Sequence, residues 1–367
     1  MIFMRRALII FTLASSPLFA QINNPAQVTQ LSTSLATTIT ISQPAEKLLH
    51  GVYVEQHGQV LIESYFKSGD KKIGDIWAHE TDFNATTLHD TRSISKSVIS
   101  LLIGVALQQG KINSLDEPVV DILKNISDQT HDPEKRKITL RHLLTMSSGL
   151  KWDEDGSVSI FSNETVMEFS TNMARYVLER PVAETPGKHY VYNSGGVVLL
   201  GAVLETVTGM PLDQYANQVL FAPLGIKNWE WQSSLISHQK MAHAGLRLTP
   251  RDLAKIGELV LKQGNWNGQQ IIPVAYLRDS LTRHLNAEDE WGYGYLWRTG
   301  TAQINGAGWD WIAAMGNGGQ RLFIVPKLDL VIVITAGRYN QAGAENGYPS
   351  NLLFKKLLTD VLPFSGS

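Results

Sequence analysis

One long segment of this sequence can only be accommodated inside a folded domain. It reads Val98-Ile-Ser-Leu-Leu-Ile-Gly-Val-Ala-Leu107, and a helix of this composition is apolar nearly all the way round. Such a helix is packed on every side by other elements, so the chain must build a core large enough to surround it. Just before it, Ser93 and Lys96 are three residues apart and share a helix face. The sequence therefore predicts a serine hydroxyl beside a lysine at the N-terminal end of a core helix.

Burial would decide the chemistry of Lys96. An ammonium group in apolar surroundings is costly unless it is paired, and the usual relief is a lowered pKa. A neutral lysine beside a serine hydroxyl is a base beside a nucleophile. The same spacing occurs four more times, starting at Ser64, Ser68, Ser148 and Ser237. Only Ser93 opens a long apolar helix. The alternative is that Ser93 is a helix N-cap and that Lys96 extends to the surface.

The composition is that of a globular protein and excludes several classes of function. The 367 residues are 43% hydrophobic and 18% charged, with a formal net charge of −2. Near-neutral charge without a basic run gives no support for nucleic-acid binding. The chain has no cysteine, which excludes disulfides, thiol catalysis and thiolate metal sites. The histidines are scattered and form no His-Glu-x-x-His motif, so we predict no metal site.

The first 20 residues are typical of an export signal. A short basic region at Met4-Arg-Arg6 precedes an apolar stretch from Ala7 to Phe19, and Ala20 stands before the expected cleavage point. The stretch is too short to span a bilayer comfortably, although an uncleaved anchor is the alternative. We therefore expect a periplasmic or secreted protein with no stable membrane span after signal cleavage. Residues 21–45 are rich in Thr, Ser and Gln and are expected to form a loose lead-in.

Strands are predicted near both ends of the chain, with helices between them. Alternating apolar residues from Gly51 to Phe66 predict a hairpin, and residues 291–337 are rich in strand-like segments. An amphipathic helix from Ser350 to Val361 closes the chain. This order predicts an α+β fold with an inserted helical domain. The predicted division is residues 46–110 and 241–367 for a discontinuous α/β domain, and residues 111–240 for the helical insertion.

A tyrosine-rich motif lies ahead of another apolar helix. It reads Tyr190-Val-Tyr192-Asn-Ser194, and a tyrosine hydroxyl can relay a proton to a leaving group. Ser194 can form a hydrogen bond beside Tyr192, which favours Tyr192 over Tyr190 as the residue that faces a cleft. The alternative is that both tyrosines are packing residues.

A glycine cluster leads into one of the predicted strands. It reads Ala314-Met-Gly316-Asn317-Gly318-Gly-Gln320, and glycines at a strand edge permit the close approach of substrate or backbone. An exposed N–H of Asn317 could face the N–H of Ser93 and complete an oxyanion hole. The alternative is a plain turn.

Taken in order, these motifs resemble those of the serine β-lactamase and penicillin-binding superfamily, in particular its class C-like hydrolases. Ser93-Ile-Ser-Lys96 matches the Ser-x-x-Lys element of these enzymes, and Tyr192-Asn-Ser194 matches their Tyr-x-Asn/Ser element. The resemblance covers residues 45–362. It implies a β-lactamase/transpeptidase-like fold, an antiparallel sheet flanked by helices. It also implies catalysis by Ser93, Lys96 and Tyr192 through an acyl-enzyme, with no metal or organic cofactor.

The third motif of the family, Lys/His-Thr-Gly, is replaced here. The best match is Ala314-Met-Gly316, and a shifted match would use Gly316-Asn317-Gly318; neither supplies a cation. In β-lactamases and D-Ala-D-Ala peptidases that cation helps to hold the substrate carboxylate. The resemblance is therefore closer to 6-aminohexanoate-dimer hydrolases and class C-like esterases. The residues expected to contact substrate are Ser194, Trp152, Gly316 and Gly318. Five tryptophans could line an aromatic cleft, namely Trp152, Trp291, Trp297, Trp309 and Trp311.

We therefore expect a hydrolase of a small ester, amide or peptide-like substrate. A β-lactamase or D-Ala-D-Ala carboxypeptidase is the enzymatic alternative. A non-catalytic cell-wall binding or sensor protein on the same fold is the other, and it would be acylated without turning over. An α/β-hydrolase is excluded because the chain lacks a Gly-x-Ser-x-Gly pentapeptide. Which of Lys96 and Tyr192 is the base stays open, because coupled groups share their titration.

Overall fold

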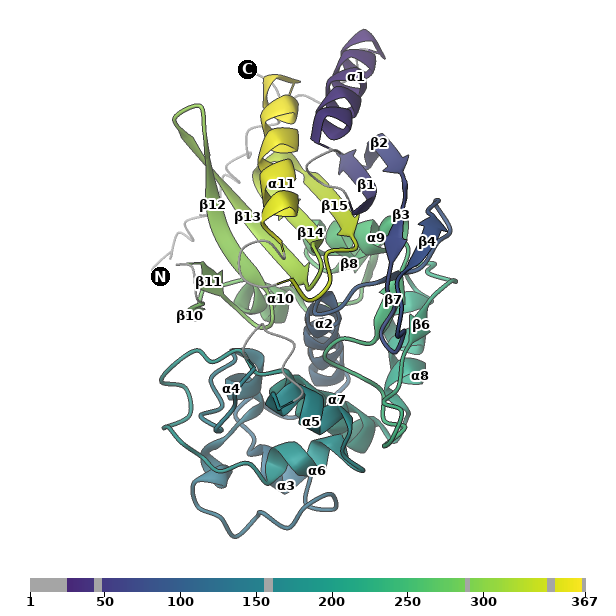
Figure 1. The fold of residues 1–367 in the computed structure, drawn as a ribbon. Coiled ribbons are helices and arrows are strands. Elements are labelled where there is room, and N and C mark those ends of the chain that lie inside the picture. The colour runs from purple at the N-terminus through teal and green to yellow at the C-terminus, as the bar shows by residue number, and fades with distance from the viewer. Residues whose placement is uncertain (1–24, 43–47, 155–160, 288–290, 342–346, 365–367) are drawn as a thin grey trace, which may run out of the picture.

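The computed structural model describes residues 25–42, 48–154, 161–287, 291–341 and 347–364; the predicted signal segment lies outside them. An eight-stranded antiparallel sheet with the order β10-β11-β12-β13-β14-β15-β1-β2 is the centre of the fold (Figure 1). Its strands are β1 (Leu49–Gln56), β2 (Gln59–Tyr65), β10 (Leu285–Asn286), β11 (Gly292–Tyr293), β12 (Arg298–Ile304), β13 (Ala307–Gly316), β14 (Gln320–Val325) and β15 (Leu330–Ala336). Because β1 pairs with β15, the two ends of the chain form one sheet, as the sequence predicts.

Short connections fix the order of neighbouring strands. The predicted hairpin is β1–β2, and its turn residues His57 and Gly58 both have positive φ, 52° and 73°, as a tight hairpin turn requires. A 3₁₀ turn, η4 (Pro326–Leu328), joins β14 to β15. Three smaller sheets surround the main one. They contain β3 (Lys67–Asp70) with β4 (His79–Asp82), β5 (His89–Asp90) with β7 (Leu246–Leu248) and β6 (Glu230–Trp231), and β8 (Asn265–Trp266) with β9 (Gln269–Gln270).

Helices α1 (Pro25–Ser42) and α11 (Tyr348–Val361) cover one face of the main sheet (Figure 1). The prediction of a loose lead-in over residues 21–45 is therefore wrong for the part that forms α1. Leu31, Leu35 and Ile39 recur every four residues and are fully buried in the core beneath α11. This narrow apolar stripe is set among Thr and Ser residues of low helix propensity, so tertiary packing supplies most of the stability of α1.

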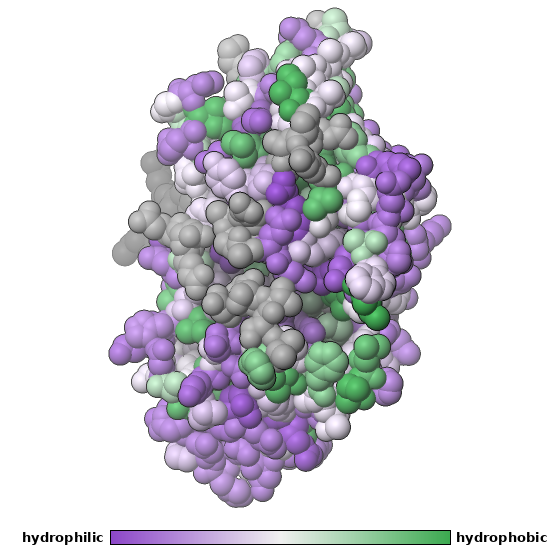
Figure 2. Space-filling model, in the orientation of Figure 1, coloured by the Kyte–Doolittle hydropathy of each residue, from purple (hydrophilic) through white to green (hydrophobic). Residues whose placement is uncertain are grey.

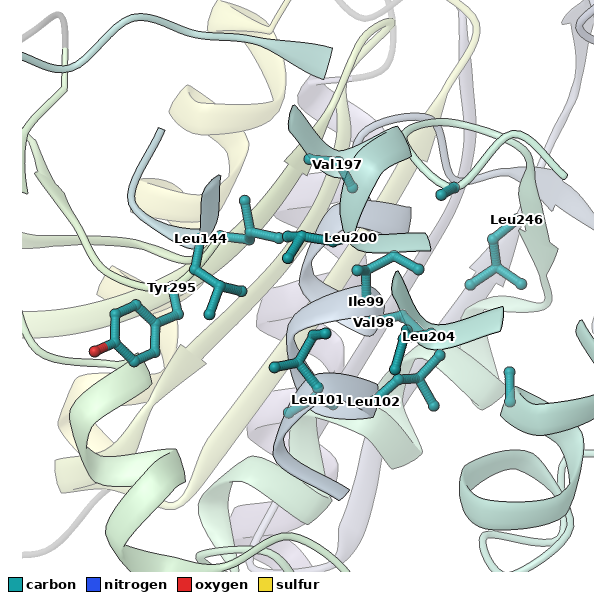
Figure 3. Packing of buried hydrophobic residues seen from close by; sticks show 14 of the residues in the cluster. Val98, Ile99, Leu101, Leu102, Leu144, Val197, Leu200, Leu204, Leu246 and Tyr295 are labelled. Atoms are coloured by element: carbon teal, nitrogen blue, oxygen red, sulfur yellow. The ribbon is translucent and has the colours of Figure 1, made fainter. Parts of the chain in front are cut away.

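The opposite face of the sheet carries α2 (Ile94–Gln108), α9 (Pro250–Leu261) and α10 (Val274–Ser280). Every residue of α2 from Ile94 to Ala106 is buried, which confirms the prediction of a core helix. The side of α2 that faces away from the sheet packs against α7 (Ser194–Thr208). Figure 3 shows Ile99 and Leu102 of α2 beside Leu200 and Leu204 of α7. The position of Ser93 and Lys96 is thus fixed by packing on both sides of α2.

Most of the remaining helices lie between residues 111 and 240, below the sheet in Figure 1. They are α3 (Val119–Ile122), η1 (Lys135–Lys137), α4 (Leu140–Leu144), α5 (Asn163–Glu168), α6 (Met173–Leu178), α7, α8 (Leu212–Ala216) and the π-helical turn η2 (Asn217–Phe221). One continuous core cluster joins them to the sheet and includes Leu140 and Val177 as well as Leu322 and Val331. The division into two domains stays a prediction.

The described surface is mixed in character. Figure 2 shows hydrophilic residues over the lower helical part of the visible face and hydrophobic residues gathering above it. Large exposed apolar side chains lie on or beside α5 at Phe161, Val166 and Phe169. Within the described ranges no single helix is long and apolar enough to cross a membrane; α7 with the segment from Leu212 to Phe221 meets that test only as a pair bent by 77°.

Candidate active site

Ser93 and Lys96 meet at the start of α2, as their spacing predicts. Lys96 Nζ donates a hydrogen bond to Ser93 Oγ over 2.9 Å. Ser93 stands at the N-cap position of α2, but its side chain makes no capping hydrogen bond, so capping does not account for its hydroxyl. The side chain of Lys96 does not extend to the surface, because the residue is only 2% exposed. The hydroxyl of Ser93 is therefore bonded to the buried amine of Lys96 and not to a backbone N–H of α2.

Other hydroxyl groups of α2 attach the surrounding loops. Ser95 Oγ donates to the Arg92 carbonyl over 2.7 Å and accepts from the Leu246 N–H at 3.1 Å. Ser97 Oγ donates to the Leu296 carbonyl over 2.6 Å. Arg92, directly before Ser93, has a φ of 51°, a left-handed conformation that is strained for a residue with a Cβ. Such strain persists only where the surrounding contacts enforce it, and here it lies next to the candidate nucleophile.

Lys96 is surrounded by acceptors and negative groups. Besides Ser93, its Nζ donates to the His243 carbonyl over 2.9 Å and lies 5.0 Å from the centre of the Tyr192 ring. Burial by itself lowers the pKa of Lys96, but Tyr192, Glu154 and Glu164 together outweigh burial and raise that pKa. The direction of this shift runs against the prediction that Lys96 is kept neutral, and it favours the ammonium form of Lys96.

Tyr192 reaches Lys96 because α7 begins two residues after it. Asn193 is the N-cap of α7, and its Oδ1 accepts from the Gly196 N–H at 3.0 Å. Tyr190 instead packs edge-on against Tyr293, with 4.9 Å between ring centres. The structure thus places Tyr192, and not Tyr190, beside Lys96.

A glutamate that the sequence analysis missed occupies the position next to Ser194. Glu154 accepts hydrogen bonds from Ser194 N at 2.7 Å, from Ser194 Oγ at 2.5 Å and from Trp152 Nε1 at 2.8 Å. Ser194 is 0% exposed and Trp152 only 8%. Both side chains are buried and bonded to Glu154, and their predicted contact with substrate stays a prediction. Burial, followed by repulsion from Glu164, raises the pKa of Glu154 to about 7.

The glycine cluster forms the turn between β13 and β14, and it brings the end of β13 against the residue pair before Ser93. A Cβ on Gly316 would lie 2.3 Å from the Thr91 carbonyl oxygen, so only glycine permits this approach. Gly318 has a φ of 86° and accepts from the Arg338 N–H. The Asn317 side chain donates to Asn340 Oδ1 at 3.0 Å and accepts from the Asn340 N–H at 2.8 Å. The proposed oxyanion role of the Asn317 N–H stays a prediction.

The five tryptophans do not line one cleft, so that expectation is wrong. Trp297 is completely buried in the core. Trp291 packs edge-on against Trp311, with 5.3 Å between ring centres, and both line a cavity of about 600 Å³. None of the residues lining this cavity is Ser93, Lys96 or Tyr192.

Behind Lys96 lies a cluster of ligand-type side chains. One donor atom each from Glu164, Glu168 and His243 falls within 4.8 Å of the others, a set that a divalent ion could use. His243 Nε2 lies 2.9 Å from Glu168 Oε1 and 3.7 Å from Glu164 Oε1. The histidine–carboxylate hydrogen bond accounts for this geometry by itself. Its visible effect is to hold His243, whose carbonyl accepts from Lys96.

A sheet built from both chain ends, above a buried helix that begins with Ser93 and Lys96, is the β-lactamase/transpeptidase-like architecture. The family model described as Beta-lactamase matches residues 45–350, and the chain belongs to that family. The family and fold inferred from the sequence motifs are thereby confirmed.

Comparison with individual proteins gives more distant similarities. A protein of Escherichia coli K12 assigned as a D-alanyl-D-alanine carboxypeptidase is 24% identical over 208 residues, 55% of this chain and 46% of its own. Esterase EstB of Burkholderia gladioli is 26% identical over 184 residues, 48% of this chain and 45% of its own. The matched stretch thus spans just under half the length of both relatives.

Solved structures show the same fold at lower identity. The hydrolase EstCE1, described as having promiscuous acyltransferase activity, has a TM-score of 0.70 at 18% identity, covering 89% of this chain and 99% of its own. A Bacillus anthracis protein assigned as a 6-aminohexanoate-dimer hydrolase has a TM-score of 0.69 at 20% identity, covering 86% of this chain and 79% of its own.

Proposed function

We propose that this protein is a serine hydrolase that cleaves ester or short amide bonds through an acyl-enzyme on Ser93. The observation that carries the proposal is the buried amine of Lys96 donating to Ser93 Oγ, with Tyr192 beside it. Membership of the β-lactamase family supports it. A hydroxyl so placed, next to groups that exchange protons, is an activated nucleophile.

The reaction has two stages, acylation of Ser93 and hydrolysis of the acyl-enzyme. Ser93 Oγ forms a bond to the substrate carbonyl carbon while its proton passes to the Lys96–Tyr192 pair, and the N–H groups of Ser93 and Asn317 stabilise the oxyanion. The bond to the leaving alcohol or amine then breaks, and that group receives a proton from the pair. A water molecule next attacks the acyl carbon, its proton passes to the pair, and Ser93 leaves with a proton as the carboxylic acid is released.

The charge on Lys96 limits how the first proton moves. A protonated amine cannot accept a proton, so either Tyr192 accepts it as a phenolate or Lys96 first loses its own proton. An ammonium beside Tyr192 stabilises the phenolate by charge attraction. The pH dependence of acylation then reports a value that belongs to the pair.

Three observations bear on the substrate. The end of β13 carries Ala314, Met315 and Gly316 where a substrate-binding cation would stand, and one relative is an esterase; both favour esters or short amides. The relative assigned as a D-alanyl-D-alanine carboxypeptidase favours the second candidate, a D-Ala-D-Ala carboxypeptidase or β-lactamase.

One purified sample tests these alternatives. We expect turnover of p-nitrophenyl butyrate to exceed that of nitrocefin and of a D-Ala-D-Ala peptide, and a fluorophosphonate probe to label Ser93. Ser93→Ala should abolish turnover and labelling while its circular dichroism stays that of the wild type. Turnover retained by Ser93→Ala would refute the proposal. One equivalent of product without a steady state would instead identify a non-catalytic binding or sensor protein.

We also propose export, on the strength of residues 1–20. Their basic and apolar order is that of a secretory signal. Fractionation of expressing bacteria and mass spectrometry of the mature N-terminus test this. A chain found in the cytoplasm that still carries residues 1–20 would contradict it.

A further inference from the structure

Glu154 lies at the N-terminus of α7, where its carboxylate receives several donors. Its Oε2 accepts from Ser194 N at 2.7 Å and from Trp152 Nε1 at 2.8 Å, and its Oε1 accepts from Ser194 Oγ at 2.5 Å. Ser194 is the first residue of α7. The aligned peptide dipoles of a helix favour a negative charge at this end. The carboxylate is therefore bound firmly to the start of α7.

These contacts also control the segment that carries Tyr192. Gly195 leaves room for the indole of Trp152, because a Cβ there would lie 2.6 Å from the Trp152 ring. The ring and the carboxylate together fix both the first and the second residue of α7. Tyr192 is two residues before Ser194 in the chain. Holding Ser194 consequently limits how far the Tyr192 ring can move from Lys96, 5.0 Å away.

The charge of Glu154 acts on the candidate proton acceptors. The charged and titratable groups that interact with it are Lys96 on α2, Glu164 on α5 and Tyr293 on β11. Tyr192 interacts in turn with Lys96. A negative Glu154 stabilises the Lys96 ammonium and disfavours a phenolate nearby. The pKa of Glu154, about 7, makes this charge change in the neutral range.

We propose that Glu154 is a positioning residue for acylation, which holds Tyr192 against Lys96 and sets through its charge the pH at which Ser93 becomes reactive. The inference rests on the proposed function. The predicted direction of the pH shift is the same whether Lys96 or Tyr192 is the base. A negative neighbour raises the pKa of an amine and of a phenol alike. The alkaline limb of the labelling profile is the rise in rate that occurs as the base loses its proton. Removing the charge should therefore move this alkaline limb to lower pH, by about one unit for a single nearby charge.

The experiment compares three variants with the wild type. The rate of fluorophosphonate labelling of Ser93 is measured across the neutral and alkaline range. Glu154→Gln keeps the size of the side chain but removes the charge, so its alkaline limb should move to lower pH. Glu154→Asp keeps the charge, so its limb should stay at the wild-type pH even where shorter reach slows the reaction. A role limited to structure would slow labelling at every pH without moving the limb.

Ser194→Ala provides a second measurement that does not depend on the folding of Glu154→Gln. It removes one hydrogen bond that lowers the pKa of Glu154, so the inflection near neutral pH should move upward. Its alkaline limb should stay in place, because the carboxylate is charged there. An unmoved limb in folded Glu154→Gln, or an unmoved neutral inflection in Ser194→Ala, would overturn the inference. Labelling of Ser93→Ala at the wild-type rate would instead overturn the proposed function.

Discussion

Substitution of Gly316 tests whether the contact between β13 and the start of α2 is needed. A Cβ at Gly316 would lie 2.3 Å from the Thr91 carbonyl oxygen and 3.1 Å from Arg92 Cβ, whereas ordinary contacts begin at 3.4 Å. Both obstacles belong to or adjoin the backbone, so in Gly316→Ala the strand must move away by about 1 Å. Overpacking of this kind costs about 1–3 kcal/mol of the free energy of unfolding. A displacement of about 1 Å at a reacting centre costs about a hundredfold in rate.

Two assays measure the two parts of this prediction. Urea unfolding gives the loss of stability, and the rate of fluorophosphonate labelling gives the loss of nucleophilic reactivity at Ser93. The control is Gly69→Ala, where the nearest atom to a new Cβ is Leu48 Cδ2 at 3.6 Å, an ordinary contact. Both quantities should stay close to wild type in that variant. A Gly316→Ala protein with wild-type stability and labelling rate would refute the steric reasoning.

Two further predictions concern stability. Burial lowers the pKa of His50 from 6.5 to about 4. Between pH 6.5 and pH 4 the unfolded state therefore binds more protons than the folded state. The free energy of unfolding should fall by up to about 3 kcal/mol as the pH drops through this range. His50→Asn should lose less between neutral and mildly acidic pH in urea unfolding, and an equal loss would contradict this. Asp90→Ala removes the buried carboxylate that Arg247 Nε bonds at 2.8 Å, while Glu230 and the Leu88 carbonyl still accept from that guanidinium, and it should cost about 3 kcal/mol. Asp121→Ala, which breaks an exposed pair, should cost about 1 kcal/mol or less, and equal costs would contradict the assignment of burial.

Local patterns predicted the parts of the site that lie close together in sequence. The spacing from Ser93 to Lys96 is a property of one helix turn, so the contact follows once α2 forms. The hairpin β1–β2 follows from alternation and a turn that accepts positive φ. The signal for the core helix is equally local, because a helix that is apolar on all sides has to be buried.

Distant residues decided what the local patterns could not. Lys96 is buried as predicted, yet its pKa is raised, because Tyr192, Glu154 and Glu164 approach it from other elements. Nothing in the segment around Glu154 signals this approach. Ser194 matched a motif and was expected to contact substrate, but Glu154 occupies both of its donors.

The sequence by itself determined the contact between Ser93 and Lys96, the core helix, the family, and the strands near both chain ends with helices between them, since these depend on periodicity, short spacings and motifs. The tertiary structure alone decided the direction of the pKa shift of Lys96, the burial of Ser194 and Trp152, and the need for glycine at position 316. Charge and steric fit depend on distances in space. Folding sets those distances between residues that are far apart along the chain.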